Sequence, residues 1–128
     1  MTMNLRALLP LAAGAAILLS ASASMGAAPV KTEAGMFVNT AGMTLYTFDK
    51  DPAGSGKSAC NGPCAKNWPP FMAGGADAAA GDWTIVTRDD GGKQWAYKGK
   101  PLYLWIKDQK PGDKTGDGFN KVWHVARP

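Results

Sequence analysis

Nucleophiles, metal ligands and clustered charges are scarce in this sequence of 128 residues. It holds one histidine, His124, and two cysteines, Cys60 and Cys64. With a single histidine, the sequence has few residues for a Ser-His-Asp arrangement or another partnered acid and base, so we expect no enzyme activity. Lysines and arginines stand singly among aspartates, and the formal net charge is only +4. This pattern is typical of a mixed, solvated surface and predicts no nucleic-acid partner.

Long apolar runs are confined to the start of the chain. Arg6 precedes an apolar stretch at residues 7–19, and small residues follow, as they do in a secretory leader. The stretch is too short to cross about 30 Å of hydrocarbon, so we expect no membrane span. We therefore predict a signal peptide over residues 1–28, cleaved after Ala23 or Ala28. The mature protein is expected to be soluble, and periplasmic or secreted.

The most informative feature that is present is a ten-residue segment that occurs twice. Residues 42–51 and residues 99–108 align at a constant offset of 57 (99 − 42). Each copy reads glycine, two residues, Leu-Tyr, any residue, an aromatic residue, any residue, Lys-Asp. The repetition predicts a duplicated strand that ends in an acidic turn.

Each copy has the pattern of a strand that is covered on both faces. Side chains alternate between the two faces of a strand. In the second copy this places Leu102, Leu104 and Ile106 on one face, with Tyr103 and Trp105 on the other. Apolarity on both faces favours a central strand over an edge strand.

The rest of the mature chain is predicted to consist of short antiparallel strands and turns. We expect one mainly β domain at residues 29–128, with small α content and two divergent repeats at about 35–72 and 83–126. A hairpin is expected in the first half and four antiparallel strands in the second, with a small-residue linker between them. The predicted strands lie at residues 36–38, 43–48, 83–88, 93–97, 102–106 and 121–125.

The two cysteines favour a disulfide in an exported protein. Closing so small a loop would stabilise the fold by about 2 kcal/mol on the chain-entropy model. The bond is expected within a short helical turn between Ser58, a candidate N-cap, and Trp68. The alternative is a shorter turn that Pro63 opens, through Cys64 to Trp68. A redox-active pair is disfavoured, because Cys60 and Cys64 lack the two-residue spacing of thioredoxin-like sites.

A soft-metal site is the alternative use of the same cysteines. Thiolate and thioether ligands favour Cu(I). Such a site would combine Cys60, Cys64 and His124, with a methionine at position 36, 43 or 72 nearby. A histidine on a strand and scattered methionines are more often structural, so no cofactor is our first expectation.

The combined motifs resemble the bacterial secreted repeat, or lipoprotein repeat, family with its Y-x-[FWY]-x-x-D motif. The resemblance covers about residues 35–125, including the cysteine segment at residues 60–70. Many members carry a lipidated cysteine, which this leader lacks. The residues that match the motif are Tyr46, Phe48, Asp51, Tyr103, Trp105 and Asp108.

The resemblance implies no established activity, so the function is predicted from the residues around it. We expect Asp51 and Asp108 to accept backbone N–H bonds that fix the loops after them. The motif rings are expected in the core, with a stacking surface for a flat ligand or for a protein partner as the alternative. The predicted function is a non-catalytic binding or structural module of the cell envelope, with an unknown envelope protein or small ligand as its partner. A periplasmic copper or redox accessory protein is the second hypothesis.

Overall fold

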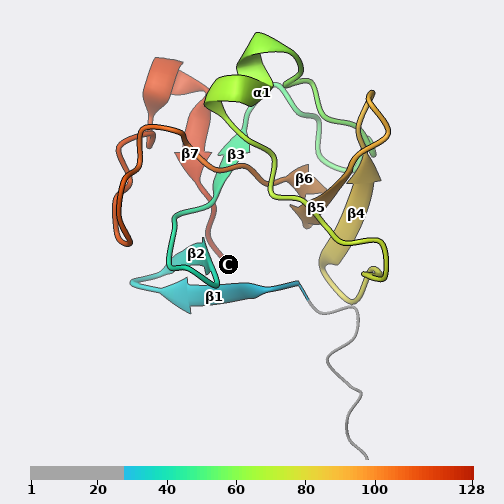
Figure 1. The fold of residues 1–128 in the computed structure, drawn as a ribbon, viewed down its shortest axis with the longest axis horizontal. Helices are drawn as coiled ribbons and strands as arrows, with labels where there is room; N and C mark the ends of the chain where they lie inside the picture. Colours follow the sequence, from blue (N-terminus) through green and yellow to red (C-terminus); the bar gives the residue numbers. More distant parts are fainter. Residues whose placement is uncertain (1–27) are drawn as a thin grey trace, which may run out of the picture.

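The structure is a computed structural model that describes residues 28–128. The predicted signal peptide therefore lies outside the described residues, except for Ala28. Strands dominate the described part of the chain, as predicted, and the helices are short (Figure 1). In chain order the elements are β1 (Val30–Glu33), β2 (Met36–Asn39), β3 (Tyr46–Phe48), α1 (Pro63–Asn67), β4 (Trp83–Thr87), β5 (Lys93–Tyr97), β6 (Lys100–Pro101), the 3-10 turn η1 (Phe119–Lys121) and β7 (Trp123–Val125).

The strands form three small antiparallel sheets, which confirms the mainly β prediction. The pairs are β1 with β2, β3 with β7, and β4 with β5, which also pairs with β6. Strand β1 was not predicted, because Val30–Glu33 is mostly polar and largely exposed. It pairs with β2 through a tight turn in which Ala34 and Gly35 both have positive φ. Such turns match the right-handed twist of a hairpin.

The prediction of four strands within the second half is wrong in one respect. Strand β7 lies beside β3 of the first half, with Tyr46 opposite Val125 (Figure 1). Pro70 and Met72, at the end of the first half, bridge Tyr103 and Gln94 of the second half, while β6 in the second motif segment still pairs with β5. The two halves thus exchange their last segments. Local sequence pattern predicts that a strand exists, but it does not choose between two similar pairing partners.

The two motif segments lie side by side at the centre of this exchange. The backbone N–H of Tyr46 donates to the carbonyl of Tyr103 at 2.8 Å, and the N–H of Tyr103 donates to the carbonyl of Tyr46 at 2.9 Å. Both tyrosines are fully buried, as are Leu45 and Leu102, one residue before each. The central position predicted for these segments is therefore correct.

The end of the second motif segment differs from the prediction. Ile106 was expected on a buried aliphatic face, but it is 56% exposed. The chain turns at Ile106, and its N–H donates to the carbonyl of Asn67 at 3.0 Å. The strand here is β6 (Lys100–Pro101), and within residues 102–106 only Tyr103 forms isolated bridges, so the predicted bounds of this strand are wrong. Regular alternation between two faces stops where the chain turns.

The helical turn begins at the second of the two predicted positions, Pro63. Ser58 does not cap it: α1 starts after Gly62, with Pro63 at its first position. Proline suits this position because its missing N–H would have no partner inside the helix. Gly62 has a φ of 58°. The helix ends at Asn67, and the N–H of the next residue, Trp68, donates to the carbonyl of Cys64 at 2.8 Å.

A column of four stacked aromatic rings fills one of the two cores. The central pair, Trp68 and Trp123, lies with ring centroids 3.8 Å apart and planes 3° from parallel. Trp105 stacks on the outer face of Trp68 at 3.9 Å, and Phe48 stacks on Trp123 at 4.2 Å. Large rings bury much apolar surface for their number, which suits a small domain.

The column repeats the exchange between the two halves. Trp68 and Trp123 are separated by 55 residues (123 − 68), and Phe48 and Trp105 by 57 (105 − 48). Each tryptophan of the central pair stacks on the motif ring of the other repeat. The stacking contacts on the two sides of the central pair are therefore equivalent, as in an approximately two-fold symmetric arrangement.

A second core lies on the other side of the motif segments, where the aliphatic residues point. It contains the buried residues Phe37, Leu45, Phe71, Trp95, Leu102 and Ala126.

Candidate functional site

The acidic and phenolic groups of the motif pair across the two repeats. The hydroxyl of Tyr46 donates to Oδ2 of Asp108 at 2.6 Å. The hydroxyl of Tyr103 donates to Oδ2 of Asp51 at 2.5 Å. Each repeat thus supplies the tyrosine for the aspartate of the other. This pairing places all four side chains in the interior, away from any open surface.

The other carboxylate oxygen of each aspartate holds the loop that follows it. Oδ1 of Asp51 accepts the N–H of Ala59 at 2.6 Å. Oδ1 of Asp108 accepts the N–H of Thr115 at 3.0 Å and its hydroxyl at 2.6 Å. Hydrogen bonds to a carboxylate are stronger than those between neutral groups. The two aspartates therefore link the repeats and anchor both loops.

Burial raises the pKa values of three groups in this network. It raises the pKa of Tyr46 and of Tyr103 well above the ordinary value, and the hydrogen bond to an aspartate raises each further. Burial also raises the pKa of Asp51, against the lowering effect of the hydrogen bonds from Tyr103 and Ala59. Both phenols stay protonated, so neither is suited to act as a nucleophile or base at neutral pH.

A buried arginine, which the sequence analysis missed, completes the network around Asp51. Arg88 is 4% exposed at the end of the β4–β5 hairpin. One guanidinium nitrogen donates to Oγ of Ser58 at 3.0 Å and to Oε1 of Gln94 at 2.7 Å. The other donates to the carbonyl of Cys60 at 2.6 Å. A buried charge needs such partners, and its positive charge also favours the ionised form of Asp51.

Ser58, the residue expected to cap the helical turn, belongs to the same network. Its Oγ lies 2.5 Å from the hydroxyl of Tyr103 and accepts the N–H of Cys60 at 3.2 Å. Every hydrogen bond of this serine is made inside the protein, and it has no histidine partner. Its position supports a structural role.

The cysteines form the predicted disulfide, and they are the only two in the sequence. Cys60 is buried and Cys64 lies on α1, so the bond ties the helical turn to the aromatic core. His124 is half-exposed on β7, and its Nε2 lies 2.8 Å from Oδ2 of Asp49. Across residues 28–128, no three His, Cys, Asp or Glu side chains gather as metal ligands would. The structure thus does not bring together the set expected for copper.

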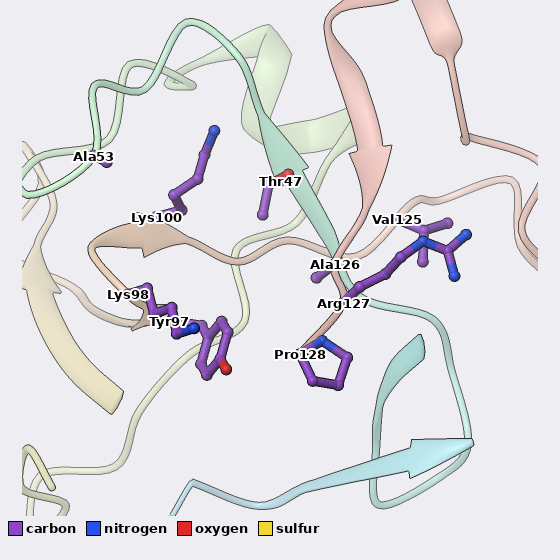
Figure 2. A pocket seen from close by; sticks show the side chains of 9 residues that line it. All are labelled: Thr47, Ala53, Tyr97, Lys98, Lys100, Val125, Ala126, Arg127 and Pro128. Carbon is purple, nitrogen blue, oxygen red and sulfur yellow. The ribbon is translucent and has the colours of Figure 1, made fainter. Parts of the chain in front are cut away.

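A surface pocket of about 290 Å³ lies where the two repeats meet the C-terminal segment (Figure 2). Tyr97, Lys98 and Lys100 form one side of it, and Thr47 of β3 faces them with the end of the chain (Figure 2). None of these residues was a predicted site residue, because nothing in their spacing indicates that they converge. The residues lining the pocket are Thr47, Ala53, Tyr97, Lys98, Lys100, Val125, Ala126, Arg127 and Pro128.

Comparison with known families identifies the chain. A family model described as a secreted repeat of unknown function matches residues 28–72 and 84–127. The chain belongs to this family of secreted repeats and carries two copies of the repeat. No curated protein and no solved structure gave a significant match. Within the described residues, none of the helices has the length and apolarity that a membrane crossing requires.

Proposed function

We propose that the protein is an exported, non-catalytic module of the cell envelope, and that it acts by binding a ligand in the pocket between its two repeats. The observation that carries this proposal is the position of the pocket. Residues from β3, from the β5–β6 turn and from the C-terminal segment line it, so its shape depends on the joined repeats. Ligand pockets commonly form at such junctions.

The state of the motif residues supports binding over catalysis. Tyr46, Asp51, Tyr103 and Asp108 are buried and bonded to one another. They hold the repeats together and offer no reactive group to a substrate. The leader predicted at residues 1–28 and the description of the family as secreted both support export, to the periplasm or outside the cell.

Co-sedimentation with fractionated cell envelopes tests this proposal. The mature protein, residues 29–128, is mixed with washed cell-wall and membrane fractions, and the bound share is measured. Ala53 is exposed and lines the pocket, so Ala53→Trp should fill it and abolish binding. Ala79 is exposed in the linker and does not line the pocket, so Ala79→Trp is the matched control and should bind as the native protein does.

Two results would contradict the proposal. One is binding that Ala53→Trp leaves unchanged, because the pocket would then be irrelevant to it. The other is the absence of binding to every fraction by the native protein.

A further inference from the structure

We propose that the pocket binds an acidic monosaccharide, whose carboxylate or phosphate group is attracted by the positive charge of Lys98 and Lys100. This inference deepens the proposed function and rests on it. Three features of the pocket support it: its charge, its rigid wall, and its size and lining.

The charged side chains that line the pocket are all basic. Lys98, Lys100 and Arg127 line it, and no aspartate or glutamate side chain does. In residues 28–128 neither lysine forms an ion pair. In the sequence as given, the carboxylate of Pro128 adds one negative charge, which leaves an excess of two (3 − 1). Such an excess in a concave site attracts an anion.

The three basic side chains are not equivalent. The guanidinium of Arg127 points away from the two lysines and toward the β1–β2 turn, where it makes one long hydrogen bond of 3.5 Å to the carbonyl of Gly35 (Figure 2). The ammonium group of Lys98 lies 5.4 Å from the ring centroid of Tyr97. Lys100 is half-buried on β6, beside the pocket. Figure 2 shows the side chains of Lys98 and Lys100 pointing in different directions, so they attract an anion from two parts of the pocket and do not clamp it together, with Arg127 at the rim.

A rigid turn positions the two lysines. Lys98 and Gly99 both have positive φ, 49° and 84°, and form the tight turn between β5 and β6. The N–H of Gly54 donates to the carbonyl of Gly99 at 2.9 Å, which fastens the turn to the loop after Asp51. A Cβ on Gly99 would lie 2.5 Å from the nitrogen of Gly54, so only glycine fits. A preorganised wall lowers the entropic cost of binding.

The size and lining of the pocket favour a sugar over a bare ion. A volume of about 290 Å³ is at the lower end for ligand pockets, and suits a ligand of one sugar ring. Val125, Ala126 and Pro128 supply apolar wall, which an inorganic ion would leave without contacts. Thr47 and Tyr97 carry hydroxyl groups that form no hydrogen bond to any part of residues 28–128, and these are suitable partners for sugar hydroxyls.

Calorimetric titration of the mature protein with four probes tests the proposal. The probes are galacturonate, glucose 1-phosphate, uncharged galactose and inorganic phosphate. We expect at least one of the two acidic sugars to bind, and both neutral sugar and inorganic phosphate to bind far more weakly. The sugar that binds more tightly identifies the anionic group as carboxylate or phosphate.

Charge-neutral variants test the role of the lysines. Lys98→Gln/Lys100→Gln should weaken binding of the acidic sugar by about tenfold or more, which corresponds to about 1.4 kcal/mol. The matched control, Lys107→Gln/Lys114→Gln, loses the same charge at exposed positions outside the pocket and should bind as before. Lys100 also lies close enough to Asp51 to favour its ionised form. The exposed Lys98→Gln alone therefore provides a variant whose fold is unaffected, and it too should bind more weakly.

Each outcome decides a separate point. Equal weakening in the control pair would overturn the site, because the attraction would then be that of a general positive charge. An absence of binding by both acidic sugars would overturn the ligand class. If envelope binding is still abolished by Ala53→Trp in that case, the proposed function stands without this inference. If Ala53→Trp has no effect on envelope binding, the proposed function itself fails.

Discussion

Removing one hydroxyl group at a time measures what the exchanged tyrosine–aspartate pairs contribute. Hydrogen bonds to a charged acceptor contribute about 1.5–3 kcal/mol, and more when the acceptor left behind is buried. Asp51 is 1% exposed and Asp108 is 8% exposed. We therefore expect Tyr103→Phe to lower the free energy of unfolding by about 3 kcal/mol and Tyr46→Phe by about 2 kcal/mol. Either loss is a large part of the stability of a small domain.

The chain supplies its own control for this experiment. Tyr97 is half-buried, and its hydroxyl makes no hydrogen bond within the described part of the protein. Tyr97→Phe should change the free energy of unfolding by less than about 0.5 kcal/mol. Urea unfolding followed by tryptophan fluorescence gives all three values. Equal costs for the three tyrosines would refute the pairing.

A double-mutant cycle tests which aspartate belongs to which tyrosine. Tyr103→Phe combined with Asp51→Asn should show a coupling energy of about 1 kcal/mol or more, because the two side chains touch. Tyr103→Phe combined with Asp108→Asn should show less coupling, because Asp108 bonds to the other tyrosine. The reverse result would mean that each repeat pairs its own tyrosine with its own aspartate.

Three further predictions concern the disulfide, the aromatic column and pH. Replacing Cys60 and Cys64 by alanine should cost about 2 kcal/mol in urea unfolding, and reductant should then have no further effect. Gly116→Ala should cost about 1–3 kcal/mol by overpacking, because its Cβ would lie 2.6 Å from a tryptophan ring, whereas Gly75→Ala meets nothing and should cost under about 0.5 kcal/mol. Because burial raises the pKa of Asp51 above 3.8, the folded state keeps that proton to higher pH than the unfolded chain does. This contribution to stability is lost as pH rises through the raised pKa, so the native protein should gain stability relative to Asp51→Asn as pH falls from neutral toward 3.8.

The parts of the fold that depend on local pattern were predictable. The repeated pattern located the motif segments, although not the bounds of their strands, and the Asp-Asp-Gly-Gly run at residues 89–92 is typical of the tight turn found between β4 and β5. The disulfide followed from two cysteines in an exported chain. In each case the residues that determine the structure are close in sequence, so the pattern contains the needed information.

The partner of each segment was not predictable in this way. The two motif segments have nearly the same pattern, so by sequence either one could pair with β7. In the folded chain β7 pairs with β3 of the first segment. In the sequence, Arg88 has no feature that separates it from a surface arginine. Its partners Ser58 and Gln94 come together around it only in the folded protein. The pocket likewise combines residues as far apart as Thr47 and Pro128. These features depend on distant segments, and one sequence does not contain that information.

Because of the exchange between the repeats, each repeat depends on the other for partners of its buried polar groups. A single repeat on its own would bury a phenol and a carboxylate without the groups that satisfy them, and half of its tryptophan stack would face water. Two identical single-repeat chains that associate around a symmetry axis would supply these missing hydrogen-bond partners and rings to each other. The two repeats of this chain thus satisfy each other as the two subunits of a symmetric dimer would.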